Sequence, residues 1–295
     1  MSAGGPSEYE VIRLLDTDTV ALRNVVCSGT CRHRSMEECV STTHLVFPYR
    51  GVYLRHVGSN QAVADANQVL FFNAGEGYQV SHPVAGGDAS LSLTLSEPAL
   101  RELAPKSLLN GRDRSGFRRQ HLRIDLRAQA SVAALRHGLD NGIFEPLEAE
   151  GRALTLVRRS LEPPRARESG ATRSRHRLAD RVKVLLASDL SRRWSLADIA
   201  AEIRGSPVYL TQVFQQTEGI PLYRYHLRLR LARALDLIAH CGDISTLAAD
   251  LGFSSHSHFA AAFRQAYGRS PTAFRQSARR HWKSLKISTA DEDAG

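Results

Sequence analysis

Short apolar segments separated by turn residues run through the N-terminal third of the chain. Stretches rich in Val, Leu, Thr and Phe recur at intervals of about ten residues, with glycines and polar pairs between them. The candidate strands are residues 20–26, 43–47, 51–55, 69–72, 77–81 and 90–95. Many short, evenly spaced strands are typical of a small β-barrel or jelly roll. We therefore predict a β-rich domain over about residues 9–96.

The apolar positions take a helical period after this region. Residues 97–104 and 128–161 are expected to be helical, the second because apolar residues such as Leu135 and Leu139 recur at steps of three and four. Amphipathic helices of this kind either cover a sheet or pair with a second subunit, and different helices can do each. Residues 162–177 carry prolines, glycine and charges with little to bury, which is typical of a linker.

From Leu178 onward the pattern is wholly helical, and it contains the plan of a helix-turn-helix twice. In the first unit, residues 195–219, Ser195 is placed to cap a helix that Gly205 closes. Pro207 then suits the first position of the next helix, where its missing N–H costs nothing. Helix, tight turn and second helix form the geometry that places a helix in the major groove of DNA.

The second unit repeats this plan. Gly252 makes the corner, since glycine adopts the left-handed backbone that a sharp turn requires, and Phe259 and Phe263 anchor the next helix. Residues 221–239, between the units, have the pattern of one long helix. We call the second helix of each unit, the one that would enter the major groove, its reading helix. The long helix is expected to hold the two reading helices about one DNA turn apart.

Charge is distributed unevenly along the chain. Residues 1–164 contain 18 Lys and Arg against 18 Asp and Glu, whereas residues 165–286 contain 21 against 9. The basic excess falls on the helix-turn-helix segment, which indicates a polyanionic partner. Five arginines there are candidates for phosphate contact, although each also suits a solvated surface. They are Arg228, Arg230, Arg264, Arg275 and Arg279.

The segment from about residue 177 to 280 resembles the DNA-binding domain of the AraC/XylS family of transcription regulators. The resemblance rests on spaced residues of the second unit. They are Arg230, Leu231, Ala234, Ile238, Ile244, Leu247, Ala248, Gly252, Phe253, Phe259, Phe263, Gly268, Ser270 and Pro271. It implies an α+β protein of two domains. The N-terminal domain would be a cupin-like β-barrel with covering or dimerisation helices, and the C-terminal domain would be all-α, with two helix-turn-helix units joined by a long helix.

The resemblance also implies a domain plan and partners. Residues 1–161 would form an effector-binding or dimerisation domain, 162–177 a linker, 178–283 the DNA-binding domain and 284–295 an acidic tail. The partners would be a double-stranded DNA operator, a second copy in a homodimer, a small-molecule effector and, for an activator, RNA polymerase.

The family's base-reading positions fall on the outward faces of the two reading helices. They are Val208, Thr211, Gln212, His256, Ser257 and His258. Gln212 can bond adenine through two hydrogen bonds, and Thr211 can bond a base or touch a thymine methyl group. The run of alanines at 260–262 offers no polar side chain. We therefore expect the second unit to contribute position and shape contacts more than base reading.

Cysteines and a histidine in the N-terminal region are spaced unlike any common zinc pattern. They are Cys27, Cys31, His33 and Cys39. Metal or thiol sensing is one interpretation of them, and small buried residues are the other. The turn at residues 73–78 resembles a cupin turn but has Tyr78 where a metal-binding histidine would stand, so we predict no catalytic metal and no cofactor. A small-molecule pocket is expected instead, with candidates Phe72, Glu76, Tyr78 and His82.

Together these features predict a sequence-specific DNA-binding transcription regulator that is not an enzyme. The alternatives are a sensor regulator that uses the N-terminal cysteines and histidine, and a cupin enzyme fused to a DNA-binding module. No apolar run reaches membrane-span length, and the first residues lack the features of a signal peptide. We therefore expect a cytoplasmic, nucleoid-associated protein that makes no membrane contact and keeps its cysteines reduced.

Overall fold

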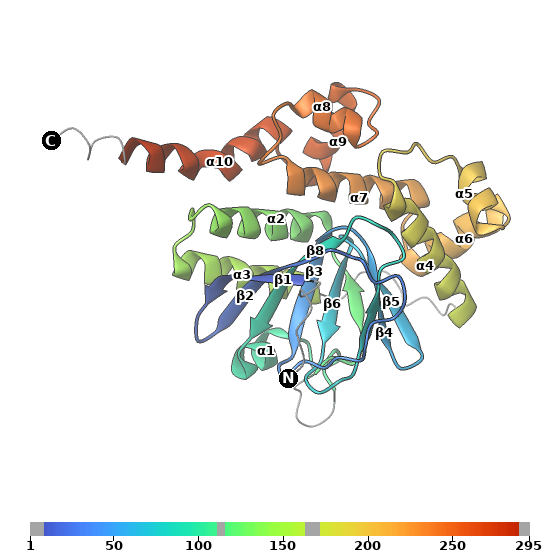
Figure 1. The fold of residues 1–295 in the computed structure, drawn as a ribbon, viewed down its shortest axis with the longest axis horizontal. Helices are drawn as coiled ribbons and strands as arrows, with labels where there is room; N and C mark the ends of the chain where they lie inside the picture. The colour runs from blue at the N-terminus through green and yellow to red at the C-terminus, as the bar shows by residue number, and fades with distance from the viewer. Residues whose placement is uncertain (1–8, 111–115, 163–171, 289–295) are drawn as a thin grey trace.

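The computed structural model describes residues 9–110, 116–162 and 172–288 (Figure 1). The strands are β1 (Tyr9–Asp16), β2 (Val20–Cys27), β3 (His44–Arg50), β4 (Tyr53–Val57), β5 (Asn60–Ala64), β6 (Gln68–Phe72), β7 (Gln79–Ser81), β8 (Asp88–Leu95) and β9 (His121–Arg123). The helices are α1 (Glu97–Leu103), α2 (Leu126–Asp140), α3 (Pro146–Leu161), α4 (Arg173–Ser188), α5 (Leu196–Ile203), α6 (Pro207–Glu218), α7 (Leu222–Leu237), α8 (Ile244–Asp250), α9 (His256–Tyr267) and α10 (Pro271–Ser288). A sheet-rich N-terminal region followed by a helical C-terminal region confirms the predicted α+β organisation.

The strands form two open sheets rather than a barrel. One sheet has six strands in the order β1-β2-β8-β3-β6-β9, and the other has three in the order β5-β4-β7. The edge strands β1 and β9 each pair along one side only, with β2 and β6 respectively. Among the described residues no sheet closes on itself, so the predicted closed β-barrel is wrong.

Apolar and polar residues alternate along β8, so its side chains show which face of the larger sheet is packed in the core. Ala89, Leu91, Leu93 and Leu95 belong to the main hydrophobic core, and the serines and Thr94 between them face the other way. Helices α2 and α3 cover the apolar face, where their own leucines and valines join the same core (Figure 1). The polar face of the sheet therefore stays clear of helices.

The long helical stretch predicted over residues 128–161 is two helices. Between α2 and α3, Gly142 has a left-handed backbone with φ of 61°, and Pro146 stands at the start of α3. A left-handed glycine ends a helix, and proline cannot extend one from the preceding turn. Both helices bury apolar faces against the sheet, so the covering role holds for them, and pairing with a second subunit stays a prediction.

The C-terminal half has the predicted helical plan. Its first helix, α4, begins at Arg173, within the range predicted as a linker, and residues 163–171 lie outside the described residues. The long connecting helix is α7, close to the predicted range 221–239. Of the predicted acidic tail, residues 289–295 also lie outside the described residues. No helix in the described ranges is long and apolar enough to cross a membrane.

The two helix-turn-helix corners differ in how they reach the left-handed conformation. In the second unit Gly252 has φ of +74°, as predicted. In the first unit the left-handed residue is Arg204, with φ of 56°, and not Gly205. A non-glycine residue in this region is strained, so the first corner holds its shape through the packing around it.

Gly252→Ala is expected to destabilise the protein by at least about 1–3 kcal/mol, the cost of a left-handed non-glycine residue. The new Cβ would also lie 2.2 Å from the carbonyl oxygen of Ser191, which is backbone and cannot swing away. The free energy of unfolding from urea titration measures the effect. Gly242→Ala is the control, because its added Cβ meets nothing within 4 Å. Equal loss in the two variants would contradict this explanation.

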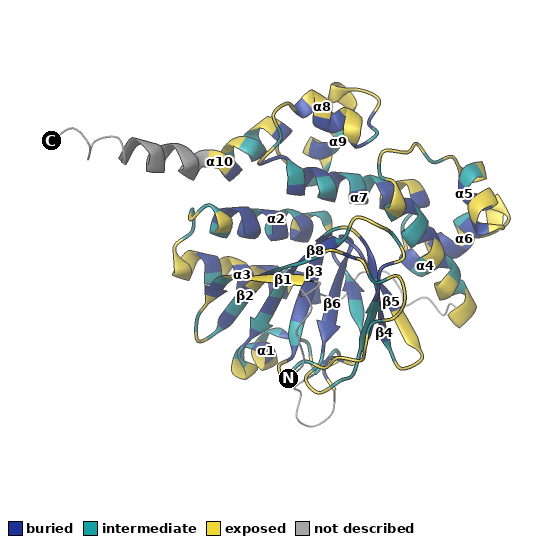
Figure 2. Cartoon of the chain, in the orientation of Figure 1, coloured by how far each residue is buried: buried dark blue, intermediate teal, exposed yellow. Residues whose placement is uncertain are grey.

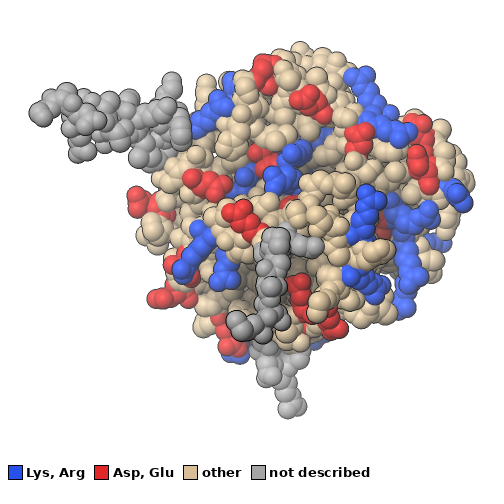
Figure 3. Space-filling model, in the orientation of Figure 1, with Lys and Arg blue, Asp and Glu red and all other residues tan. Residues whose placement is uncertain are grey.

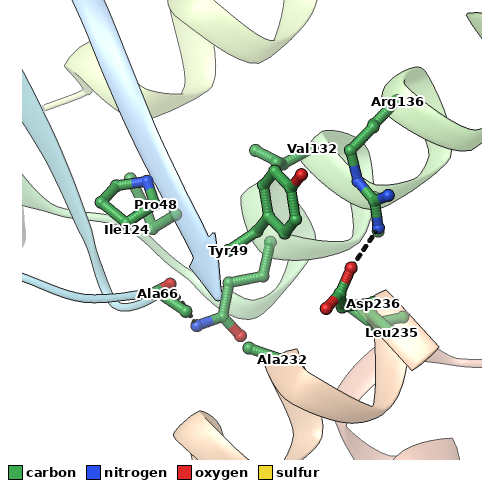
Figure 4. Close-up of a pocket in the computed structure, with 11 residues that line it drawn as sticks. Pro48, Tyr49, Ala66, Ile124, Val132, Arg136, Ala232, Leu235 and Asp236 are labelled. Atoms are coloured by element: carbon green, nitrogen blue, oxygen red, sulfur yellow. Dashed lines mark hydrogen bonds and ion pairs between the residues drawn. The ribbon is translucent and has the colours of Figure 1, made fainter. Parts of the chain in front are cut away.

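Helix α7 also joins the two halves of the molecule, since it packs along α2 and β3. Arg136 of α2 donates from Nη2 to Oδ1 of Asp236 in α7 at 2.7 Å, and its guanidinium lies 4.2 Å from the ring centre of Tyr49 (Figure 4). Tyr225 donates its hydroxyl to Asp65 at 2.5 Å. A cavity of about 10 Å³, roughly the room of one water, lies beside the first pair. The connecting helix is therefore held by polar contacts from the N-terminal half.

Candidate functional site

The predicted reading helices are α6 and α9, of 12 residues each. Each follows a serine at the N-cap position, and each ends at a left-handed glycine, Gly219 or Gly268. Their inner faces are buried in separate hydrophobic cores on either side of α7. The anchors are Leu210, Val213 and Phe214 in α6 and Phe259 and Phe263 in α9. The two helices are thus equivalent elements in a repeated scaffold.

The predicted base-reading residues lie on the opposite faces, where five of the six are exposed and Thr211 is half-buried. Figure 2 colours the exposed residues of the helical half yellow. Val208 is 69% exposed, and Gln212 is exposed as well. Thr211 is half-buried and donates its hydroxyl to the carbonyl of Pro207, so toward a base it offers an acceptor and a methyl group. On α6 these side chains share the N-terminal part of the helix, which is the part that meets base edges in helix-turn-helix proteins.

On α9 the exposed histidines and serine occupy the first turn. Ser255 caps the helix by accepting from the backbone N–H of His258, and Nδ1 of His258 lies 3.0 Å from the hydroxyl of Ser254. The ring of His258 also packs edge-on against Phe253. His256 and Ser257 are exposed. The structure thus holds His258 in place and presents the other two side chains outward.

The arginines predicted to contact phosphate occupy different surroundings. Arg264 is exposed on α9, whereas Arg228 is half-buried and burial lowers its pKa. Arg279 donates to the carbonyls of Ala239 and Cys241, and Arg275 donates to that of Gly242. Contact of any of these arginines with a DNA phosphate stays a prediction.

Arg230 has an architectural role that its sequence position did not reveal. Its guanidinium donates to the carbonyl of Leu190 at 2.7 Å, of Arg192 at 2.9 Å and of Gly252 at 3.2 Å. These contacts tie α7 to the segment before α5 and to the corner of the second unit. Arg230 therefore fixes the two units relative to each other. Figure 3 shows Lys and Arg side chains gathered on the right of the view, the side on which α4, α5 and α6 lie.

The N-terminal region contains a cavity of about 510 Å³, within the range of small-molecule sites. Alternate residues of β8, namely Ser90, Ser92 and Thr94, form part of its floor, together with His44 and Arg23 of the neighbouring strands. The floor is thus the polar face of the larger sheet. The signal that could have revealed it is the strict alternation of small polar and apolar residues in β8.

Three of the four predicted pocket residues line this cavity: Phe72, Tyr78 and His82. Tyr78 donates its hydroxyl to Glu38 at 2.9 Å, and burial raises the pKa of Tyr78, which keeps it a donor. Glu76 is not among the lining residues. It accepts instead from Arg55, a fully buried side chain, at 3.1 Å.

The predicted cysteine and histidine group does not form one cluster. Cys27, Cys31 and Cys39 all line the cavity, whereas His33 is exposed and outside its lining. The sequence spacing does not connect Cys27 with His82. Nor does it reveal Asp88, which pairs with Cys27 across β2 and β8. These partners are far apart in sequence, and only the sheet brings them together.

Similarity to known proteins is concentrated in the helical half. A family model described as a helix-turn-helix domain matches residues 199–277. The regulatory protein PocR of Salmonella typhimurium is 37% identical over 82 residues, which cover 28% of this chain and 27% of PocR. The transcriptional activator RhaR of Klebsiella pneumoniae is 32% identical over 147 residues, 50% of each chain. The chain therefore spans between about a quarter and a half of these relatives' length.

One solved structure is similar in sequence over part of the chain. An AraC-type DNA-binding domain protein from Chromobacterium violaceum is 27% identical, covers 37% of this chain and 98% of its own, and has a TM-score of 0.34. The class that the paired helix-turn-helix units define is a DNA-binding domain. More narrowly, residues 199–277 match a helix-turn-helix domain family, which confirms the resemblance drawn from the sequence for this part of the chain.

Proposed function

We propose that this protein is a sequence-specific transcription regulator that binds DNA through α6 and α9 and a small molecule through its N-terminal cavity. The observation that carries the proposal is the pair of equivalent helices, each anchored by buried residues and each presenting exposed side chains. A strongly basic half supplies attraction to the phosphate backbone. A homodimer and a contact with RNA polymerase stay predictions of the family resemblance.

Coupling between cavity and DNA would pass through α7. This helix carries both helix-turn-helix units and is held by Arg136 and Asp65 of the N-terminal half. A ligand that changes the position of these residues would bias the orientation of α7, and with it the two reading helices. The proposal needs no catalytic step, in agreement with relatives that are named as regulators.

Selection from a random DNA library is expected to enrich a bipartite motif with half-sites about one helical turn apart, 10–10.5 base pairs. Two equivalent reading helices on one rigid connector meet two successive major-groove segments on one face of the duplex. Selections at low and high salt separate base recognition from phosphate attraction. Recovery of no motif at any salt concentration would remove the proposal.

Gln212→Ala is expected to relax the preference at one base pair, at a cost of about 1–3 kcal/mol for the preferred sequence. Gln212 is exposed on the N-terminal part of α6, where its amide can form two hydrogen bonds to adenine. Binding to single-base variants of the selected site measures the effect. Gln216→Ala is the matched control, one turn further along α6, where Gln216 accepts from Arg175. Unchanged base preferences in Gln212→Ala would refute this assignment.

A further inference from the structure

Three side chains of different chemistry meet at one end of the N-terminal cavity. The thiol of Cys27, the imidazole of His82 and the carboxylate of Asp88 each place a ligand atom within 4.8 Å of the other two. All three residues line the cavity. Thiolate, imidazole and carboxylate are the three side-chain ligands of Zn²⁺ in proteins.

The fold builds this cluster from three separate segments. Cys27 ends β2 and lies directly across the ladder from Asp88, the first residue of β8. His82 follows β7, and its backbone N–H donates to the carbonyl of Cys31 at 2.8 Å, which fixes that segment over the ladder's end. The segments after β2 and before β8 approach each other closely at Gly29 and Gly87. A Cβ added to Gly29 would lie only 2.6 Å from Cα of Gly87. The close approach therefore depends on glycine at both positions.

Two members of the cluster are buried polar groups. His82 is 5% exposed and Asp88 is 6% exposed. Nε2 of His82 lies 2.7 Å from Oδ2 of Asp88, and Nδ1 of His82 is buried with no hydrogen-bond partner among the described residues. Because Nε2 faces Asp88, a metal shared by these two residues would take Nε2, and Nδ1 would be left to donate to an outer partner such as a water.

We propose that Cys27, His82 and Asp88 form a binding site for a divalent transition metal of the Zn²⁺ class in the wall of the cavity. Zinc sites with three protein ligands keep a fourth position for water or a substrate, and here that position would face the cavity. A donor atom of the small-molecule ligand would complete the coordination. Binding would convert the Cys27 thiol to a thiolate and release its proton to solvent, with no change of oxidation state.

The other cysteines provide the contrast. Cys31 and Cys39 line the same cavity but are not members of the three-residue cluster. The proposed site is therefore different from the group predicted from the sequence, which included Cys31, His33 and Cys39. It also differs from a sensor that works through a disulfide, since the cluster contains one cysteine beside a histidine and an aspartate.

The test is a Co²⁺ titration of the full-length protein after chelator treatment and dialysis. We expect saturation at one Co²⁺ per chain, with a thiolate-to-cobalt charge-transfer band and the visible bands of a low-symmetry site. Cys27→Ser should remove the charge-transfer band, and Asp88→Asn and His82→Gln should each weaken binding by at least about 10-fold, as even loss of an outer-shell partner does. Cys31→Ser and Cys39→Ser are the matched controls and should keep the spectrum and the affinity.

Two results would overturn the proposal: no saturable Co²⁺ or Zn²⁺ binding by the wild type, or binding that survives all three cluster substitutions. Circular dichroism and thermal unfolding of each variant show whether it is folded. Cys27→Ser and Asp88→Asn are nearly isosteric and keep the test informative even where His82→Gln does not fold. Operator selection on the same preparations separates this proposal from the DNA-binding function, because either can fail while the other holds.

Discussion

Replacing Lys183 by methionine is expected to lower the free energy of unfolding by about 3–5 kcal/mol, the usual cost of breaking a buried ion pair by removing one partner. Lys183 is 3% exposed, and its ammonium lies 2.6 Å from Glu218 and 3.3 Å from Asp180. Burial alone would lower the pKa of Lys183, but the attraction of Glu218 and Asp180 outweighs it and the pKa is raised. Methionine keeps the apolar stem and leaves both carboxylates without their cation.

Urea unfolding at neutral pH measures this loss. Arg177→Met is the control, since Arg177 is an exposed cation on the same helix, and surface substitutions of this kind cost within about 0.5 kcal/mol. The double variant Lys183→Met with Glu218→Gln should recover part of the loss, because it removes the stranded charge. A loss in Lys183→Met no larger than in Arg177→Met would show that the pair contributes nothing to stability.

The effect would extend beyond one helix, because the Lys183 cluster lies where the two halves of the protein meet. Asp65 on the N-terminal side accepts from Tyr225 of α7, and the charges of Lys183 and Glu218 both act on it. The ion pair between α4 and α6 thus supports the scaffold of the first reading helix and the contact to the sheet region together. We therefore expect Lys183→Met to shift one cooperative unfolding transition of the whole protein, and not to unfold one domain separately.

The helical half could be predicted from the sequence because its signals are local. A serine cap, a glycine corner and apolar residues at steps of three and four all act within one turn of chain, as Ser195, Gly252 and Phe263 show. The same period of three and four residues predicted which faces of α6 and α9 are buried and which are exposed. The left-handed Arg204 could not be predicted, because the packing that holds it comes from elsewhere in the fold.

The sheet region was harder to predict because strand pairing is not local. β1 was missed, since most of its residues are exposed and only its pairing with β2 makes it a strand. β9 has three residues and is defined by its ladder with β6. The same reason explains the missed cluster: Cys27 and Asp88 are far apart in the chain but are direct partners across one ladder.

Acidification from pH 7 to pH 5 is expected to destabilise the protein by about 3–5 kcal/mol net, at 1.36 kcal/mol per pKa unit. Burial is the first cause in each case and lowers the pKa of His121, His137 and His226 to about 4, from an ordinary value of 6.5. A histidine with a depressed pKa stabilises the fold fully above pH 6.5, and this contribution is lost as the pH falls toward 4. Each would lose roughly 2 kcal/mol by pH 5.

Three carboxyl groups oppose this trend, since burial raises the pKa of Asp65, Asp140 and Asp180, and Asp65 is the most buried of them. Burial raises the pKa of Asp65 to about 6, so its protonated form is favoured in the folded protein and its contribution grows as the pH falls through 6. The gain is about 1 kcal/mol by pH 5, smaller than the loss from three histidines. Urea unfolding at pH 7 and pH 5 gives the net sign, and a flat profile between them would contradict the expectation.

His137 is the histidine that connects this pH dependence to the contact between the two halves. It lies on α2, its Nε2 is 2.9 Å from the carbonyl of Leu235 in α7, and Arg136 beside it further disfavours the charged form. His137→Gln keeps an N–H donor without a titrating group, so it should remove roughly 2 kcal/mol of the acid-induced loss of stability. His256→Gln, the same substitution at an exposed position, is the matched control. If His137→Gln loses as much stability between pH 7 and pH 5 as the wild type, the titrating groups lie elsewhere and the α2–α7 contact does not weaken with acid.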